Sequence, residues 1–100
     1  MSRTFYSDYV KHALRFYSRY PKRPEKFNSE ADKANWTACD EIFKKQSKLQ
    51  SDILFDVYSG KDTLADEVYK ASKKYNIDQN IIWDEMKSLE HAIAKKRKLI

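Results

Sequence analysis

Glycine and proline are almost absent from this chain of 100 residues: glycine occurs once, at Gly60, and proline twice, at Pro21 and Pro24. Hairpin turns and the corners of β-sandwiches depend on these residues, whereas the abundant alanine, leucine, lysine and glutamate favour helices. Hydrophobic residues make up 41% of the chain, enough to bury a core. The composition therefore predicts an all-α fold: one domain over residues 1–100, built as a compact bundle of about five helices.

Cysteine is equally scarce. Cys39 has no second cysteine to pair with, and the chain has neither a CxxC nor an HxxxH spacing, so a disulfide framework or a zinc site of that kind is excluded. His12 and His91 are isolated, and no motif surrounds a nucleophile. We therefore expect a non-enzymatic protein without cofactor or metal, in the reducing cytoplasm.

Long apolar runs are also missing. No segment approaches the length that spans a bilayer, and the first residues do not have the pattern of a secretory leader. We expect no contact with a membrane.

The charge is distributed unevenly along the chain, whose net charge is +5. Residues 1–27 carry a net charge of +5, residues 28–94 of −4 and residues 95–98 of +4. If the basic ends meet in space, they form a positive surface that attracts phosphates or an acidic partner protein. The same charges can equally serve only to keep the domain in solution.

Apolar residues recur every three to four positions from Phe5 to Tyr20, which predicts a first helix with a wide apolar face. The residues of this face are Phe5, Tyr6, Tyr9, Val10, Ala13, Phe16, Tyr17 and Tyr20. The sequence PKRP at 21–24 should end the helix, because proline lacks an amide hydrogen and disfavours helical geometry in its predecessor. With a second helix from Ser29 to about Lys45, the N-terminal helices occupy residues 4–45.

Capping signals divide the rest of the chain into three further helices. Ser47 and Gln50 have the spacing of a capping box, and Gly60 can end that helix in the left-handed conformation. Asp62 or Thr63 can cap the fourth helix. The expected core residues of these two helices are Leu49, Ile53, Leu54, Val57, Leu64, Val68, Ala71 and Tyr75.

The connection between the last two helices is short. Asn76 tolerates a left-handed turn, and Asp78 can cap a fifth helix that runs to about Lys98. Ser72 supplies a small side chain where the two helices cross, so the segment is a helix-turn-helix candidate, although an ordinary helical corner needs the same residue types. The expected core stripe of the last helix is Ile82, Met86, Leu89 and Ile93.

The segment DILFDVYSGKDTLADEVYKASKKYNIDQNIIWDEMKSLEHAIAKKRKL resembles region 4 of bacterial sigma factors and related small phage activators of late genes. The matching positions are Ile53, Leu54, Tyr58, Ala71, Ser72, Tyr75, Asn76, Ile77, Asp78, Ile82, Met86 and Leu89. Asn76 and Asp78 replace the family's turn glycine and capping serine. YVKHALRFYSRYP and DKANW further resemble short proteins of prophages and integrative elements in Firmicutes.

The resemblance implies that residues 48–98 form a DNA-binding helix-turn-helix part whose last helix is the recognition helix. The expected outward residues of that helix are Gln79, Asn80, Trp83, Asp84 and Lys87, with Glu85 and Glu90 nearby. Glutamine and asparagine suit adenine in the major groove. Asp84 is unfavourable beside a polyanion unless it accepts a hydrogen bond from cytosine. Trp83 would mark a protein contact or cover a gap between helices.

Cations near both ends complete the predicted nucleic-acid surface. Lys95, Lys96, Arg97 and Lys98 can neutralise phosphates or stabilise a helix C-terminus. In the first helix and the PKRP segment, the candidates for phosphate contact are Arg15, Arg19, Lys22 and Arg23. The rings between these cations can stack on bases or belong to the core.

Two functions follow as hypotheses. The first is a regulator of a phage or mobile element that binds DNA. The second is a phage-encoded inhibitor or adaptor that binds an acidic surface of a host protein or ribonucleoprotein, such as RNA polymerase or a CRISPR nuclease. Whether the protein acts as a homodimer stays open.

Overall fold

The computed structural model describes residues 6–20, 22 and 24–100, and within them the chain forms five α-helices and no β-strand. These are α1 (Ser7–Arg19), α2 (Glu30–Lys44), α3 (Lys48–Ser59), α4 (Leu64–Tyr75) and α5 (Gln79–Lys96). This arrangement confirms the predicted all-α bundle of about five helices. None of the described helices combines the length and apolar character that a membrane crossing requires.

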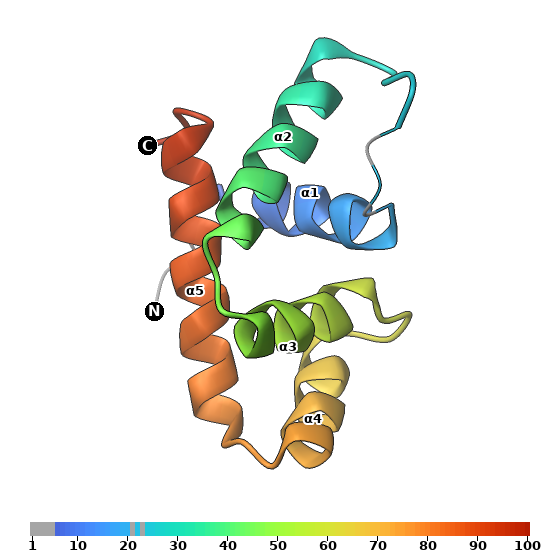
Figure 1. The fold of residues 1–100 in the computed structure, drawn as a ribbon. Helices are drawn as coiled ribbons and strands as arrows, with labels where there is room; N and C mark the ends of the chain where they lie inside the picture. Colours follow the sequence, from blue (N-terminus) through green and yellow to red (C-terminus); the bar gives the residue numbers. More distant parts are fainter. Residues whose placement is uncertain (1–5, 21, 23) are drawn as a thin grey trace.

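Helix α5 runs along one side of the other four helices (Figure 1). It packs against α1, α2, α3 and α4, with α4 near its N-terminal end and α2 near its C-terminal end (Figure 1). Ile82, Met86, Leu89 and Ile93 are each at most 2% exposed, as their spacing predicted. Side chains of this one helix therefore pack against all four other helices, from one end of the core to the other.

A buried polar cluster joins α1, α3 and α5 inside this core. Glu90 is buried, with 6% of the residue exposed. Its Oε1 accepts hydrogen bonds from Lys11 Nζ at 3.0 Å and Ser7 Oγ at 3.4 Å, and its Oε2 accepts one from Tyr58 Oη at 2.7 Å. Burial, followed by the nearby Glu90 charge, raises the pKa of Tyr58, so its phenol stays protonated and donates. The buried charge is thereby both paired and hydrogen-bonded.

The predicted helix caps are present in the structure. Ser29, Ser47 and Thr63 each accept a hydrogen bond from the backbone N–H three residues later, and Gln50 completes the capping box with Ser47. Asp78 accepts one from Asn80 N at 2.7 Å. Of the two caps considered for α4, the structure uses Thr63. Local sequence thus determines where these helices start.

The predicted left-handed C-cap at Gly60 is wrong, because this residue is extended, with φ −63° and ψ 158°. Glycine leaves space there for a side chain of the next helix. A Cβ atom on Gly60 would lie 2.0 Å from Cδ of Glu67, whose buried side chain reaches back from α4. The close approach lets Glu67 Oε2 accept the Asp62 backbone N–H at 3.0 Å.

Three expected core residues are in fact exposed: Leu49 by 54%, Tyr9 by 43% and Tyr20 by 57%. Leu14, which the apolar spacing did not include, is fully buried instead. The apolar face of α1 is therefore turned toward the Leu14 side, and it is narrower than predicted. Phe5 lies outside the described residues.

The last helix ends two residues earlier than the predicted Lys98. Lys98 has a left-handed φ of 58°, and the Leu99 N–H donates to Ala94 O at 2.8 Å. This C-terminal turn returns Leu99 to the core, whereas Ile100 remains 51% exposed.

Candidate nucleic-acid interface

The corner between α4 and α5 has three residues with defined roles. Asn76 is left-handed, with φ 54° and ψ 51°. The Ile77 N–H donates to Ser72 O at 3.1 Å, and Ser72 Oγ donates to Ile77 O at 2.5 Å. Asp78 then caps α5. The connection is closed by its own hydrogen bonds, which fixes the direction in which α5 leaves α4.

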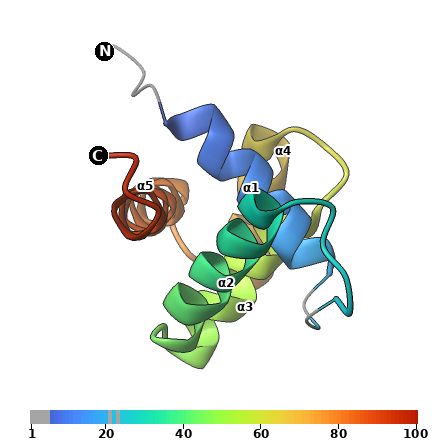
Figure 2. The same ribbon diagram turned by 90° about the horizontal axis from the view of Figure 1, so that it is seen from above.

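The side of α5 away from the bundle faces solvent. Figure 2, which looks almost along this helix, shows α1, α2 and α3 all on one side of it. Five exposed residues follow one another along the free side at spacings of four, three, four and four. We call these residues the outer stripe: Asn80, Asp84, Lys87, His91 and Lys95. The stripe therefore begins with an amide, passes one carboxylate and continues with two lysines and a histidine.

The predicted site residues at the start of α5 differ in exposure. Gln79, Asn80 and Lys87 are exposed, and no described side chain hydrogen-bonds or pairs with theirs. Trp83 is half-buried and packs against the core. Most of its indole is thus used within the fold, while the amides of Gln79 and Asn80 are free to bind.

The four C-terminal cations divide into two pairs. Lys96 pairs with Glu41 of α2, and Arg97 Nε donates to Asn35 Oδ1 at 2.6 Å. Both contacts join the end of α5 to α2. Lys95 and Lys98 are exposed, and neither has a partner among the described residues. These two ammonium groups are the ones available for phosphates.

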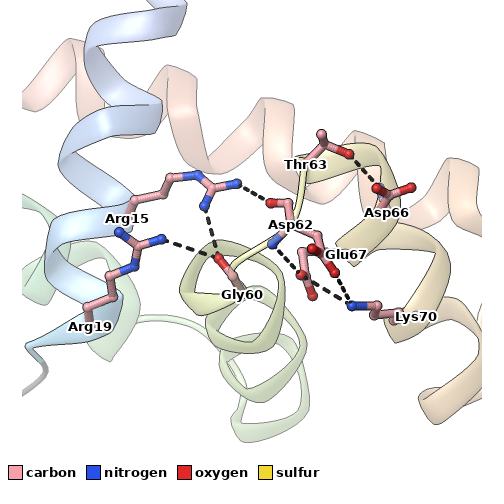
Figure 3. A network of polar contacts seen from close by, with 8 residues as sticks. All are labelled: Arg15, Arg19, Gly60, Asp62, Thr63, Asp66, Glu67 and Lys70. Carbon is pink, nitrogen blue, oxygen red and sulfur yellow. Dashed lines mark hydrogen bonds and ion pairs between the residues drawn. The ribbon is translucent and has the colours of Figure 1, made fainter.

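Arg15 and Arg19 do not form a free basic ridge (Figure 3). Arg15 donates from Nη1 to Gly60 O and from Nη2 to Asp62 O, both at 3.0 Å, and Arg19 Nη2 donates to Gly60 O at 3.4 Å. Both guanidinium groups therefore hold the loop between α3 and α4, and their positive charge compensates carbonyls at the end of α3. Lys22 is exposed, and Arg23 lies outside the described residues.

The same loop carries a surface ion pair. Lys70 Nζ contacts Asp62 Oδ2 at 2.5 Å and Glu67 Oε2 at 3.6 Å. The hydrogen bond from Lys70 lowers the pKa of Asp62, and the same bond raises the pKa of Lys70. This cation is thereby neutralised within the fold (Figure 3), whereas Lys87, Lys95 and Lys98 stay unpaired among the described residues.

An apolar surface that was not predicted from the sequence lies beside the outer stripe. Leu49 of α3 and Ile81 of α5 are each 54% exposed. They flank a groove of about 90 Å³, whose other lining residues are Gln50, Ile53, Leu54, Ile77, Ile82 and Glu85. The available signal was Ile81, an apolar residue outside the four-three-four spacing of the core stripe.

Comparisons of the chain with protein-family models, with curated proteins and with solved structures found no match.

Proposed function

We propose that this protein binds duplex DNA, with α4 and α5 acting as a helix-turn-helix and α5 as the recognition helix. The observation that carries the proposal is the free N-terminal end of α5. Gln79 and Asn80 are exposed there without side-chain partners, directly after a short corner held by Asn76 and Asp78. In such units, the N-terminal residues of the second helix face the base edges.

In this proposal, successive turns of α5 make different contacts with DNA. Asn80 can bind adenine through two hydrogen bonds, and Asp84 can accept one from the cytosine amino group. Lys87, Lys95 and Lys98 lie farther along the chain and suit phosphate oxygens, which position a protein without reading sequence. The side chain of Asp78 already accepts the Asn80 N–H, so it serves the fold.

Binding to random-sequence duplex DNA at several salt concentrations tests the proposal. Each phosphate contact contributes about 0.9 to the slope of log affinity against log salt. If Lys87, Lys95 and Lys98 each make one contact, we expect affinity to fall about 40-fold between 50 and 200 mM salt. Absence of binding at low salt contradicts the proposal and favours a host protein as partner.

A charge-matched pair of double variants localises the contact. Lys95→Ala with Lys98→Ala should weaken binding to every sequence and reduce the salt slope by about 2. Lys26→Ala with Lys61→Ala removes the same charge from two exposed loop positions that form no hydrogen bond or ion pair with α5, and it should change binding much less. Equal losses in the two variants would show that net charge, and not the end of α5, attracts DNA.

Sequence preference is tested separately at the start of α5. Gln79→Ala with Asn80→Ala should remove discrimination among DNA sequences while leaving the helical circular dichroism signal unchanged, because both side chains are exposed. A selection from a random DNA pool with the unaltered protein supplies the preferred site. If the double variant keeps its sequence preference, residues other than Gln79 and Asn80 must contact the bases.

A further inference from the structure

The two exposed apolar side chains nearest the start of α5 belong to different helices. Leu49 lies in the first turn of α3 and Ile81 in the first turn of α5. The groove between them has a floor of buried aliphatic residues, including Ile53 and Leu54 at 7% and 1% exposure. Its volume of about 90 Å³ equals the volume of about three water molecules, so the end of one branched aliphatic side chain can enter it.

Carboxylates lie near this apolar surface, chiefly on the α5 side. Asp78, Asp84 and Glu85 lie three residues before, three after and four after Ile81, and these spacings make neighbours around the start of a helix. On α3, Asp52 lies three residues after Leu49 and pairs with Lys48 at 3.2 Å. An acidic surface around an apolar groove is unusual in a chain whose net charge is +5, and it indicates a partner of opposite charge.

We propose that the groove between Leu49 and Ile81 binds a basic amphipathic helix of a partner protein. The helix would insert one aliphatic side chain between Leu49 and Ile81 and place lysine or arginine residues opposite Asp84 and Glu85. Helices bind in apolar grooves through anchors at helical spacing, while charges at the rim select the partner.

Two other occupants of the groove, duplex DNA and a second copy of this chain, are disfavoured. Duplex DNA has no aliphatic side chain to insert into the groove, and Glu85, which lines it, would face phosphate oxygens. A second copy of this chain that used the same face would bring Asp78, Asp84 and Glu85 against their own counterparts, since a twofold contact pairs a surface with itself. A basic amphipathic helix, in contrast, would be stabilised both by apolar contact in the groove and by attraction to these carboxylates.

The groove is a surface distinct from most of the outer stripe. Its second wall is α3, and Leu49 is far in sequence from every residue of the stripe. Asp84 is shared by the two surfaces, so a bound helix would cover one position of the recognition face. The groove therefore gives the protein a means of contacting a second macromolecule whether or not α5 binds DNA.

Three designed helical peptides of equal length test the proposal by calorimetric titration. The first has leucines at spacings of three and four residues and lysines elsewhere, the second has glutamate in place of every lysine, and the third has alanine in place of every leucine. We expect the first peptide to bind at least 10-fold more tightly than either of the others. Binding of the acidic peptide equal to that of the basic one, or no binding of the basic peptide, overturns the proposal.

Variants then locate the site. Leu49→Ser and Ile81→Ser should each weaken binding of the first peptide at least 10-fold. Tyr69→Ser is the matched control, because Tyr69 is a similarly exposed apolar residue, at 53%, on α4 and outside the groove; it should leave binding unchanged. If all three variants bind equally, the peptide associates elsewhere and the proposal fails.

Two further measurements separate this surface from other uses of the same region. Leu49→Ser should leave DNA affinity unchanged, so loss of peptide binding with intact DNA binding isolates the groove. Sedimentation of the protein alone should give a monomer whose mass does not depend on Leu49. A dimer that dissociates on Leu49→Ser would make a second copy the occupant and would overturn the proposal.

Discussion

The carboxyl group of Glu67 occupies the space where residue 60 would carry a side chain, and the Cβ atom of an alanine there would lie 2.0 Å from Glu67 Cδ. We therefore expect Gly60→Ala to lower the free energy of unfolding by about 1 to 3 kcal/mol, because Glu67 must leave its hydrogen bond with the Asp62 N–H. Urea denaturation followed by circular dichroism measures this change.

The same substitution in a Glu67→Ala background is the control. Gly60 has a φ of −63°, which alanine adopts without strain, so removal of the carboxyl group should make Gly60→Ala neutral or slightly stabilising. An equal loss of stability in both backgrounds would mean that the contact with Glu67 is not the cause.

Asn76 determines the corner between α4 and α5 through its left-handed backbone, with φ 54°. Asn76→Ala should lower the free energy of unfolding by about 1 kcal/mol. In the left-handed conformation Cβ lies too close to the following carbonyl oxygen, and alanine lacks the polar side chain with which asparagine offsets this cost. Asn76→Gly should cost less than Asn76→Ala or even stabilise the protein. Thermal and urea unfolding of the two variants check the order, and equal stabilities would contradict a backbone requirement at the corner.

Asp56 links α3 to the end of α4, since its Oδ2 accepts hydrogen bonds from Lys74 Nζ at 2.8 Å and Tyr75 Oη at 2.6 Å. Burial acts to raise the pKa of Asp56, but the hydrogen bonds from Lys74 and Tyr75 outweigh it and hold the pKa below 3.8. The carboxylate therefore stabilises the fold above pH 3.8, and its contribution is lost as the pH falls through the lowered folded-state pKa.

Replacing the carboxylate should reduce this acid sensitivity. We expect Asp56→Asn to lose about 0.5 kcal/mol at pH 7, the size typical of exposed ion pairs, and to show a smaller further decrease of stability below pH 3.8. Urea unfolding at a series of pH values measures both effects. If the free energy of unfolding falls with pH equally in the variant and the unaltered protein, other carboxylates cause the acid sensitivity.

Cys39 is fully buried, and burial, followed by the charge of Asp40, raises the pKa of its thiol to about 12. The reactive thiolate is therefore both rare and inaccessible in the folded protein. Alkylation at pH 8 should proceed only as fast as the fold opens, and it should become rapid in guanidinium. A Ser88→Cys variant supplies an exposed thiol on α5 for comparison; rapid labelling of Cys39 in the native protein would contradict this packing.

Asp84 provides a test specific to the proposed recognition helix. Asp84→Asn should increase affinity for random-sequence DNA, because it removes a negative charge from the outer stripe, and it should alter preference at one base pair if the carboxylate reads cytosine. Asp66→Asn removes the same charge from an exposed position on α4 and serves as the comparison. Fluorescence anisotropy with labelled duplexes measures both, and equal changes would indicate a general charge effect.

The starts of α2, α3, α4 and α5 could be predicted from sequence because their causes are local. Ser47 and Gln50 are three residues apart, and Asp78 acts on the N–H two residues later, so the interacting groups are adjacent in any helical chain. The stripe from Ile82 to Ile93 also follows from spacing within one helix. Such features do not depend on where the other helices lie.

The errors concern contacts between distant residues. Arg15 reaches carbonyls 45 and 47 residues away, and the space beside Gly60 is filled by a side chain of the next helix. Leu49 has the spacing of a core residue, yet no helix covers it. These outcomes depend on how helices pack, and a pattern within one helix contains no information about that packing.

The position of α5 along the side of the other four helices also bears on how the protein is made. This helix follows them in the chain, so it leaves the ribosome after they do. Until then, the apolar faces that Ile82, Met86, Leu89 and Ile93 will cover remain open to solvent. The helices before it can form early, but the core closes only with α5, and apolar faces left open until then favour aggregation.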